Sequence, residues 1–373
     1  MNHAIPLRPL RSSNDGQFIE VIDQTRLPHE LVILRLSSRD AVADAIRHMV
    51  VRGAPLIGAS AAWGVALALR DDASDVGLEH SLATLAGTRP TAVNLAWALA
   101  RMAARLRPMA APERCAAACD EATRICAEDE QQNHLIGEHG LQLLRALYAH
   151  VQRPVRVLTH CNAGWLATVA WGTALAPIYL AHAAGVPVEV WVDETRPRNQ
   201  GGLTAWELGQ AGVPHTFIAD NAGGHLMQRG QVDVVIVGAD RVSAQGDVCN
   251  KIGTYLKALA ARAAGVPFYA AVPSPTIDWT VADALREIPI EERAADEVEW
   301  VAGLDGEGAL RRVRVAPAGT RFGNPAFDVT PAHLVSGLIT EHGVYAATPA
   351  ALTALAARLR ELPQGGARAV TQG

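Results

Sequence analysis

The sequence predicts an α/β protein in which a mainly helical N-terminal domain, with a small β-hairpin, precedes a Rossmann-like, doubly wound parallel sheet. Two observations support this fold class. Ala-rich helical periodicity dominates the chain up to about residue 150, whereas short apolar runs alternate with amphipathic ones after Arg153. The length of 373 residues suits about two domains. We therefore expect a helical domain over residues 1–150 and a Rossmann-like domain over residues 151–373.

Two kinds of periodicity divide the N-terminal part. Residues 17–36 contain two alternating, β-branched runs around a Leu-Pro break, which predicts a hairpin. Helical spacing begins at Ser38, which can serve as an N-cap, and a Gly-Ala-Pro interruption divides residues 37–70 into two helices. Two further long helices are expected over residues 91–107 and 112–150.

The second part of the chain alternates strand and helix. Apolar runs that predict strands occupy residues 154–160, 186–194, 214–220, 232–240 and 266–272. Helix-like runs lie between them, at residues 165–185, 203–212, 222–230 and 248–265. This alternation predicts a parallel sheet with helices on both faces. The last dozen residues, 362–373, are expected to form a frayed tail.

Composition argues against several classes of protein. Hydrophobic residues make up 49% and charged residues 19% of the chain, so we expect a sizeable core and no general disorder. The net charge of −5, without a block of like charge, argues against nucleic-acid binding. No apolar stretch reaches the roughly 20 residues of a membrane span, and no signal-peptide pattern is present. We therefore expect a cytoplasmic protein with no membrane segment.

Cysteine and histidine patterns give no sign of a metal or disulfide framework. The five cysteines form an odd set without a C-x-x-C pair, and the spacing of Cys115 and Cys119 lacks a third ligand. No role is predicted for these two, for Cys126 or for Cys249, and small buried hydrophobes are the preferred interpretation. Metal-binding H-E-x-x-H and nucleotide-binding glycine motifs are also missing. We expect no metal and no cofactor.

Polar side chains follow four of the predicted strands at the point where each strand ends. Cys161 follows the first strand and Asp240 the fourth, while residues 193–196 and 220–221 follow the second and third. In an open parallel sheet, ligands bind beyond the carboxyl ends of the strands. Asp and Asn also cap helices for structural reasons, but four polar loops at one edge favour a catalytic crevice.

Cys161 and Asp240 are the sharpest candidates in this crevice. Cys161 lies between a strand and an expected helix start, where the helix dipole lowers a thiol pKa and favours the thiolate, although a small buried filler is the alternative. Asp240 follows an apolar run, in which desolvation would raise the pKa of a carboxyl group, as suits a general acid. From the residues alone, a helix N-cap or an ion pair with Arg241 explains Asp240 equally well.

Two arginine-containing segments could bind an anion. Arg52, Gly53 and Ala54 stand at a helix entry, which would place a guanidinium beside free backbone N–H groups. Arg89 is a further possible clamp, although a lone Arg before Pro is usually a surface residue.

The two lysines of the chain are a separate signal. Of 33 basic residues only Lys251 and Lys257 are lysine, so a position that keeps lysine could require a compact ammonium group. Asn250 and Lys251 follow the Asp240 loop and form a candidate anion site. Lys257 is expected to lie on an exposed helix face without a special role.

Eight segments occur in a recognisable order: VRGAPLIGASAAWG, GTRPTAVNL, LTHCNAG, DETRPRNQG, LTAWEL, VGADRV, GDVCNKIGTY and NPAFDVTP. Together they resemble the methylthioribose-1-phosphate isomerase family, which belongs to a superfamily with ribose-1,5-bisphosphate isomerases and the regulatory subunits of a translation-initiation exchange factor. The resemblance covers residues 17–347. The Cys161 and Asp240 loops resemble the enzyme branch.

This resemblance implies a cofactor-independent aldose–ketose isomerase that converts 5-methylthioribose 1-phosphate into 5-methylthioribulose 1-phosphate in methionine salvage, as a homodimer. It implies Cys161 as the catalytic cysteine and Asp240 as the proton donor. The implied substrate-binding residues are Arg52, Gly53, Ala54, Arg89, Gln200, Asn250 and Lys251. Asp240 would protonate the ring oxygen. The hydrogen would then move from C2 to C1, either through an enolate formed by Cys161 or as a hydride in a shielded pocket.

Two alternatives stay open. Loops 196–208 and 219–227 depart from the family pattern, so 5-deoxyribose 1-phosphate, alone or as a second substrate, is the runner-up. Ribose 1,5-bisphosphate is disfavoured because no second cationic site is evident. A non-catalytic sugar-phosphate or nucleotide sensor is the alternative of a different class, but a sensor needs neither Cys161 nor Asp240.

Overall fold

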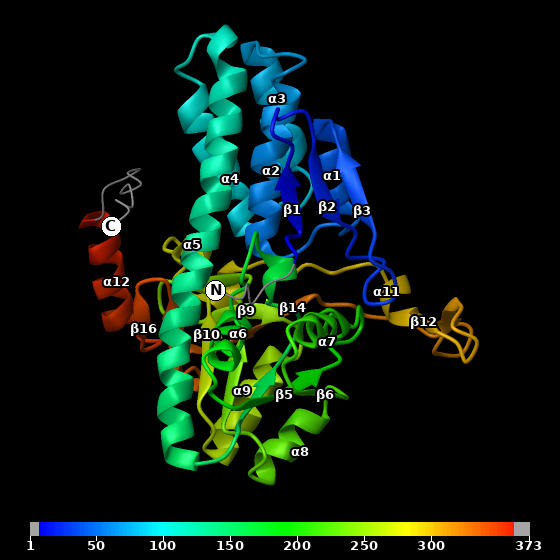
Figure 1. The fold of residues 1–373 in the computed structure, drawn as a ribbon, viewed down its shortest axis with the longest axis vertical. Helices are drawn as coiled ribbons and strands as arrows, with labels where there is room; N and C mark the ends of the chain where they lie inside the picture. The colour runs from blue at the N-terminus through cyan, green and yellow to red at the C-terminus, as the bar shows by residue number, and fades with distance from the viewer. Residues whose placement is uncertain (1–6, 362–373) are drawn as a thin grey trace.

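The computed structural model describes residues 7–361, so the predicted tail at residues 362–373 lies outside the described residues. A seven-stranded sheet organises the C-terminal part (Figure 1). In spatial order its strands are β16 (Gly343–Tyr345), β15 (Gly337–Thr340), β10 (Phe268–Ala271), β7 (Val234–Val237), β4 (Val155–Thr159), β5 (Val188–Asp193) and β6 (His215–Ile218). Every neighbouring pair is parallel except β15 and β16.

Helices cover both faces of this sheet because alternate strand residues point to opposite sides. Val234 and Ile236 of β7 share a core with residues of α5 (Ala111–Val151), α6 (Ala176–Ala183) and α7 (Gly201–Gln210). Val235 and Val237 share another with residues of α8 (Ala222–Gln228), α9 (Thr254–Ala264) and α12 (Pro349–Glu361). The predicted doubly wound sheet is therefore confirmed.

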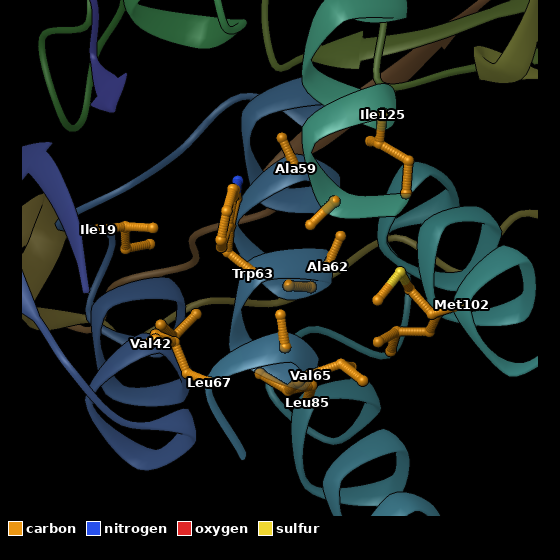
Figure 2. Close-up of a cluster of buried hydrophobic side chains, with 14 of the residues drawn as sticks. Ile19, Val42, Ala59, Ala62, Trp63, Val65, Leu67, Leu85, Met102 and Ile125 are labelled. Atoms are coloured by element: carbon orange, nitrogen blue, oxygen red, sulfur yellow. The ribbon is translucent and has the colours of Figure 1, made fainter. Parts of the chain in front are cut away.

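The N-terminal part is helical and is built around one fully apolar helix. Its elements are β1 (Leu10–Ser12), β2 (Ile19–Ile22), β3 (Ile33–Leu36), α1 (Arg39–Arg47), α2 (Ala54–Ala68), α3 (Asp75–Ala86) and α4 (Val93–Leu106). All but two residues of α2 are buried, as expected for a helix that is hydrophobic on every side. Trp63 and Leu67 of α2 pack within the cluster in Figure 2, which includes Met102 of α4 and Ile125 of α5.

Helix α5 joins the two parts of the chain. It runs for 41 residues, or about 60 Å, beside both the helical cluster and the sheet (Figure 1). Gly137 and Gly140 let it approach α6 closely, since a Cβ on Gly140 would lie 2.3 Å from Cγ of Pro177. The helix ends at Val151 and β4 begins at Val155, close to the predicted boundary, although the division into two domains stays a prediction.

A second, four-stranded sheet lies beside the main one. Its order is β11 (Ile277–Asp278), β8 (Arg241–Ser243), β9 (Val248–Lys251) and β14 (Phe327–Thr330). The remaining elements are the short helices η1 (Trp165–Ala167), η2 (Ser274–Thr276), η3 (Ala332–Leu334), α10 (Ala284–Glu287) and α11 (Asp296–Glu299), and the projecting hairpin β12 (Trp300–Leu304) with β13 (Leu310–Arg314) (Figure 1). Within residues 7–361 no helix is long and apolar enough to cross a bilayer.

Most predicted elements are present, and the errors have physical causes. The hairpin over residues 17–36 is β2 and β3, but β1 adds a third strand. The predicted helix over residues 165–185 is wrong for its first half, which has only the short η1 and a bridge between Gly164 and Gly172. The second half contains α6, as predicted.

The predicted helix over residues 248–265 is also wrong at its start. Its first residues form β9, which pairs with β14, a partner distant in sequence. Gly253 has a φ of 100° and separates this strand from α9. Helix α3 and strands β15 and β16 were not predicted at all.

We expect Gly140→Ala to destabilise the protein by about 1 to 3 kcal/mol, because the new methyl group would overlap the rigid ring of Pro177. Denaturant unfolding measures the effect. Gly209→Ala in α7 is the control, since its nearest neighbour would be 3.9 Å away, and it should be neutral or stabilise by up to about 1 kcal/mol. Equal effects at the two glycines would contradict the packing described for α5 and α6.

Candidate active site

The crevice lies where the connections of the main sheet change direction. From β4 the chain moves through β5 to β6, whereas from β7 it moves the other way to β10, so β4 and β7 are neighbours with diverging connections. Such a switch point leaves an open crevice at the carboxyl ends of the strands. Cys161 follows β4 and Asp240 follows β7, so both border this crevice, whose volume is about 1060 Å³ including the open mouth. The predicted location of the site is therefore where the structure has its main crevice.

The structure brings all the predicted site residues together. The crevice is lined by Arg52, Gly53, Ala54, Arg89, Cys161, Gln200, Asp240, Asn250 and Lys251. They come from loops or strands between residues 52 and 251, and the start of α2 supplies one wall. Their roles stay predictions, but their proximity is a structural fact.

The Arg52 segment has the geometry expected of an anion site. Gly53 caps α2 with a φ of 97°, and a Cβ there would lie 2.4 Å from Cα of Ala167, so no larger residue fits. The first N–H groups of α2 therefore begin at the crevice. Arg52 is buried, and its guanidinium donates to the side-chain and backbone oxygens of Asn162.

A buried glutamate, Glu207, binds Asn162, the residue that accepts from Arg52. Its carboxylate accepts from Asn162 Nδ2 at 2.8 Å, from the backbone N–H groups of Trp165 and Leu166, and from the Tyr179 hydroxyl. Burial raises the pKa of Glu207 to about 7, while these donors and the charge of Arg52 oppose the shift. Sequence reasoning missed Glu207, although a charged residue inside the apolar segment LTAWEL was a usable signal.

Cys161 occupies a strained turn, not the predicted helix start. Its φ is 67°, its N–H donates to Thr195 Oγ1 at 2.8 Å, and its carbonyl accepts from Thr204 Oγ1 at 2.8 Å. The predicted lowering of the Cys161 thiol pKa is wrong. Burial raises this pKa, the charges of Arg52 and Lys251 lower it, and the charge of Asp240 raises it. No helix dipole acts here, because only η1 follows the turn.

Asp240 has the environment predicted for a general acid. Burial raises the pKa of its carboxyl group, against the opposing charges of Lys251, Arg89 and Arg52. The alternative of an ion pair with Arg241 does not hold, since the Arg241 guanidinium lies 3.4 Å from Asp278 and donates to a backbone carbonyl. The alternative of a helix N-cap is also wrong, because β8 follows Asp240 directly.

The remaining cations of the crevice are incompletely compensated. Lys251 lies on β9, with Nζ 4.7 Å from the Phe327 ring centre, and within residues 7–361 no carboxylate oxygen lies within 4.0 Å of it. Burial lowers the pKa of Lys251. Arg89 pairs with Glu291 at 3.0 Å but its Nε has no partner among the described residues, and the same is true of Gln200 Oε1. Lys251 Nζ and Arg89 Nε are therefore free to donate to a bound anion, whereas Gln200 Oε1 can only accept, for example from a sugar hydroxyl.

One group of side chains has the spacing of metal ligands. Ligand atoms of His160, Asp193 and Asp220 lie within 4.8 Å of one another at the base of the crevice. Lys257 Nζ lies 3.0 Å from Asp193 and donates to the backbone carbonyl of Asp220. The Lys257 ammonium group therefore occupies part of the space between these carboxylates and offsets part of their charge. The prediction that Lys257 lies on an exposed face is wrong, because α9 packs that side chain under the sheet edge.

Comparisons with known proteins agree with this geometry. Residues 50–347 match the Initiation factor 2 subunit family. The chain is 62% identical to a methylthioribose-1-phosphate isomerase of Gluconobacter oxydans, over 92% of this chain and 95% of the relative. A protein of the same name from Methylorubrum populi is also 62% identical, over 94% and 96% of the two chains.

Two solved structures are similar over nearly the whole chain. The 5-methylthioribose 1-phosphate isomerase from Pyrococcus horikoshii OT3 has a TM-score of 0.81 at 39% identity. The match covers 95% of this chain and 97% of the isomerase chain. The translation initiation factor eIF-2B, subunit delta, from A. fulgidus has a TM-score of 0.75 at 38% identity, with 93% and 99% covered.

We expect Glu207→Gln to reduce the free energy of unfolding by about 2 to 4 kcal/mol, because the new amide would direct N–H groups at buried donors. Glu189→Gln on the exposed side of β5 is the matched control and should change stability by less than about 0.5 kcal/mol. Urea unfolding of both variants measures the difference. A tolerated Glu207→Gln would show that this carboxylate does not support the Arg52 site.

The reactivity of Cys161 should respond in opposite directions to two neighbouring charges. Lys251→Met should slow its alkylation by iodoacetamide at pH 8, and Asp240→Asn should accelerate it, by about tenfold for each unit of change in the thiol pKa. Mass spectrometry of the Cys161 peptide measures the rate. Asp71→Asn, at an exposed position after α2, should leave the rate unchanged. A shift in the same direction for both crevice variants would contradict the described electrostatics.

Proposed function

The chain belongs to the Initiation factor 2 subunit family, and we propose that it is the isomerase that converts 5-methylthioribose 1-phosphate into 5-methylthioribulose 1-phosphate. Identity of about 60% to curated relatives of that name, over more than nine-tenths of both chains, supports this assignment. The observation that carries it is the presence of Cys161 and Asp240 in one crevice beside Arg52 and Lys251. A thiol and a desolvated acid beside uncompensated cations suit acid–base chemistry on a phosphorylated sugar.

The first chemical step is ring opening. The phosphate on C1 prevents spontaneous opening, so an acid must protonate the ring oxygen as the bond from C1 to that oxygen breaks. Asp240 is the proposed acid, because burial raises the pKa of its carboxyl group and favours the protonated form. The partial burial of Asp240 also strengthens its interactions with the nearby charges of Lys251, Arg89 and Arg52.

The second step moves hydrogen from C2 to C1, and the C2 hydroxyl becomes the ketone. The proton lost from that hydroxyl replaces the one that Asp240 donated, so the reaction is redox-neutral overall and needs no cofactor. Cys161 is the proposed group beside C2. In the enolate route, a thiolate there would take the C2 proton as the electron pair of that C–H bond forms the C1–C2 double bond and neutralises the positive charge left at C1, and it would then return the proton to C1; Arg52 and Lys251 would hold the phosphate. In a hydride route, the hydrogen would pass directly from C2 to the positively charged C1 left by ring opening, and Cys161 would not exchange it.

Phosphate binding is proposed for the start of α2 and the cations around it. Arg52 keeps further N–H donors beyond the two bonds to Asn162, and the first N–H groups of α2 begin beside it at Gly53 and Ala54. Lys251 faces the crevice from β9. The other proposed binding residues, Arg89, Gln200 and Asn250, would contact the sugar hydroxyls or the phosphate.

The alternatives are less well supported. Curated relatives at about 60% identity carry the methylthio name, which favours this substrate over 5-deoxyribose 1-phosphate. The initiation-factor subunit would suit a non-catalytic role, and its 38% identity is close to the 39% of the solved isomerase, but the 62% identity to two curated isomerases supports the enzyme. We also propose, from the family resemblance, that the reaction serves methionine salvage and that the enzyme is a cytoplasmic homodimer. Sedimentation of the purified protein tests the dimer.

We expect the purified protein to form ketose from 5-methylthioribose 1-phosphate without added metal or nucleotide. Cys161→Ser and Asp240→Asn should each lower kcat by about 10²- to 10⁴-fold, because each removes a proton-transfer group. Assays on 5-deoxyribose 1-phosphate and ribose 1,5-bisphosphate run in parallel give the substrate preference. Tight binding of the methylthio sugar without turnover by the wild-type protein would favour the sensor function.

A further inference from the structure

A buried cluster of charged side chains lies under the Cys161 turn and has no part in the chemistry proposed above. It consists of His160, Asp193, Asp220 and Lys257 and is called here the His160 cluster. The side chains of His160, Asp193 and Lys257 are 1%, 0% and 5% exposed. They come from four elements, since His160 follows β4, Asp193 ends β5, Asp220 follows β6 and Lys257 lies on α9. Burial of so many charges is costly unless each is paired.

The hydrogen bonds of His160 determine how many protons its ring carries. Nε2 lies 2.8 Å from the backbone carbonyl oxygen of Ile252, which can only accept, so Nε2 must carry a hydrogen. Nδ1 lies 3.1 Å from Oδ2 of Asp193. Lys257 Nζ lies 3.0 Å from the same oxygen and stabilises the ionised carboxylate. An ionised carboxylate also only accepts, so Nδ1 must carry a hydrogen as well.

The hydrogen bond between His160 and Ile252 joins two chain segments that carry site residues. His160 immediately precedes Cys161, and Ile252 immediately follows Lys251. The bond from Nε2 therefore ties the turn that bears the thiol to the strand end that bears the ammonium group. The bond from Nδ1 fixes the ring against β5. Both ring nitrogens can donate only while the ring holds two hydrogens.

We propose that the His160 ring donates from both nitrogens, as an imidazolium, and that it acts as a positioning residue that fixes the spacing between Cys161 and Lys251. The evidence is that both ring nitrogens face obligate acceptors in a fully buried setting. The consequence for turnover rests on the proposed isomerase function, whereas the protonation state does not.

The charges around the ring are consistent with this state. Asp193 faces Nδ1, and Asp220 Oδ1 lies 3.8 Å from it on the side of β6. Asp328 of β14 binds the N–H groups of Gly253 and Tyr255, and the charge of His160 is one of the effects that lower its pKa against the dominant rise from burial. Lys257 is the other cation, so two cations lie among three carboxylates. The competing arrangement, a neutral ring with a protonated Asp193, would place an uncharged acid against Lys257.

Nuclear magnetic resonance of the full-length protein with ¹⁵N-labelled histidine tests the protonation state directly. At pH 8.5 a free imidazole, with a pKa of about 6.5, is neutral, so free ¹⁵N-labelled histidine in the same buffer provides the reference. We expect both ring nitrogens of His160 to show the protonated shift at this pH. His160→Asn, which lacks the signal, assigns it. A single protonated nitrogen on His160 would overturn the proposal.

Kinetics on matched variants separate positioning from simple stability. His160→Gln can keep a donor near the Ile252 carbonyl, whereas His160→Asn can reach only Asp193. We expect Asn to lower kcat by about 10²-fold and Gln by about tenfold, with little change in KM, because a shift of about 1 Å at the reacting groups costs about that much. His225→Gln should leave kcat unchanged. Equal losses in the Asn and Gln variants would overturn the positioning role.

The two proposals fail in different ways. A doubly protonated His160 in a wild-type protein that does not turn over the methylthio sugar would refute the isomerase function and leave the imidazolium intact. Normal turnover with a singly protonated His160 would refute the imidazolium and leave the isomerase function intact. The resonance measurement needs only the wild-type protein and one assignment variant, so it does not depend on all the variants folding.

Discussion

The reversal of strand order between β4 and β7 is the constraint on which the rest of the structure depends. Because the connections from these two neighbours diverge, no loop crosses the space above them. Cys161 and Asp240 reach the same crevice although 79 positions separate them in the chain. The helical N-terminal part then covers this opening, with the start of α2 supplying one wall. A sheet with a different order would separate the thiol from the acid.

Burial gives this crevice its electrostatic character. Desolvation raises the pKa of Cys161 and Asp240 and lowers that of Lys251, so each group is biased toward its uncharged form. The guanidinium of Arg52 stays charged, and its partner is the Asn162 amide, with Glu207 one bond further away. A phosphate dianion would supply the charge that the ligand-free crevice lacks. Outside the crevice, the buried Asp193 is paired with Lys257, whereas the buried Glu207 is held by neutral donors.

Local patterns were sufficient to predict the strands β4, β5, β6, β7 and β10 and the sheet edge that borders the crevice. Apolar runs and the polar residues at strand ends are both local signals. Long-range pairing was not predictable in this way. The assignment of Asn250 and Lys251 to a helix failed because β14 pairs with that segment from 70 or more residues away. Lys257 and Glu207 were misjudged or missed because their burial depends on tertiary neighbours. The predicted direction of the Cys161 pKa shift was wrong for the same reason, since burial by tertiary neighbours raises this pKa and only the short η1 follows the turn.

The most direct test of this account is a crystal structure with 5-methylthioribulose 1-phosphate bound. The account predicts that the phosphate oxygens contact the Arg52 guanidinium and the first backbone N–H groups of α2, and that the sugar carbons C1 and C2 lie between Cys161 and Asp240. A ligand whose phosphate lies elsewhere, with neither Cys161 nor Asp240 in contact with the sugar, would contradict the assignment of this crevice as the catalytic site.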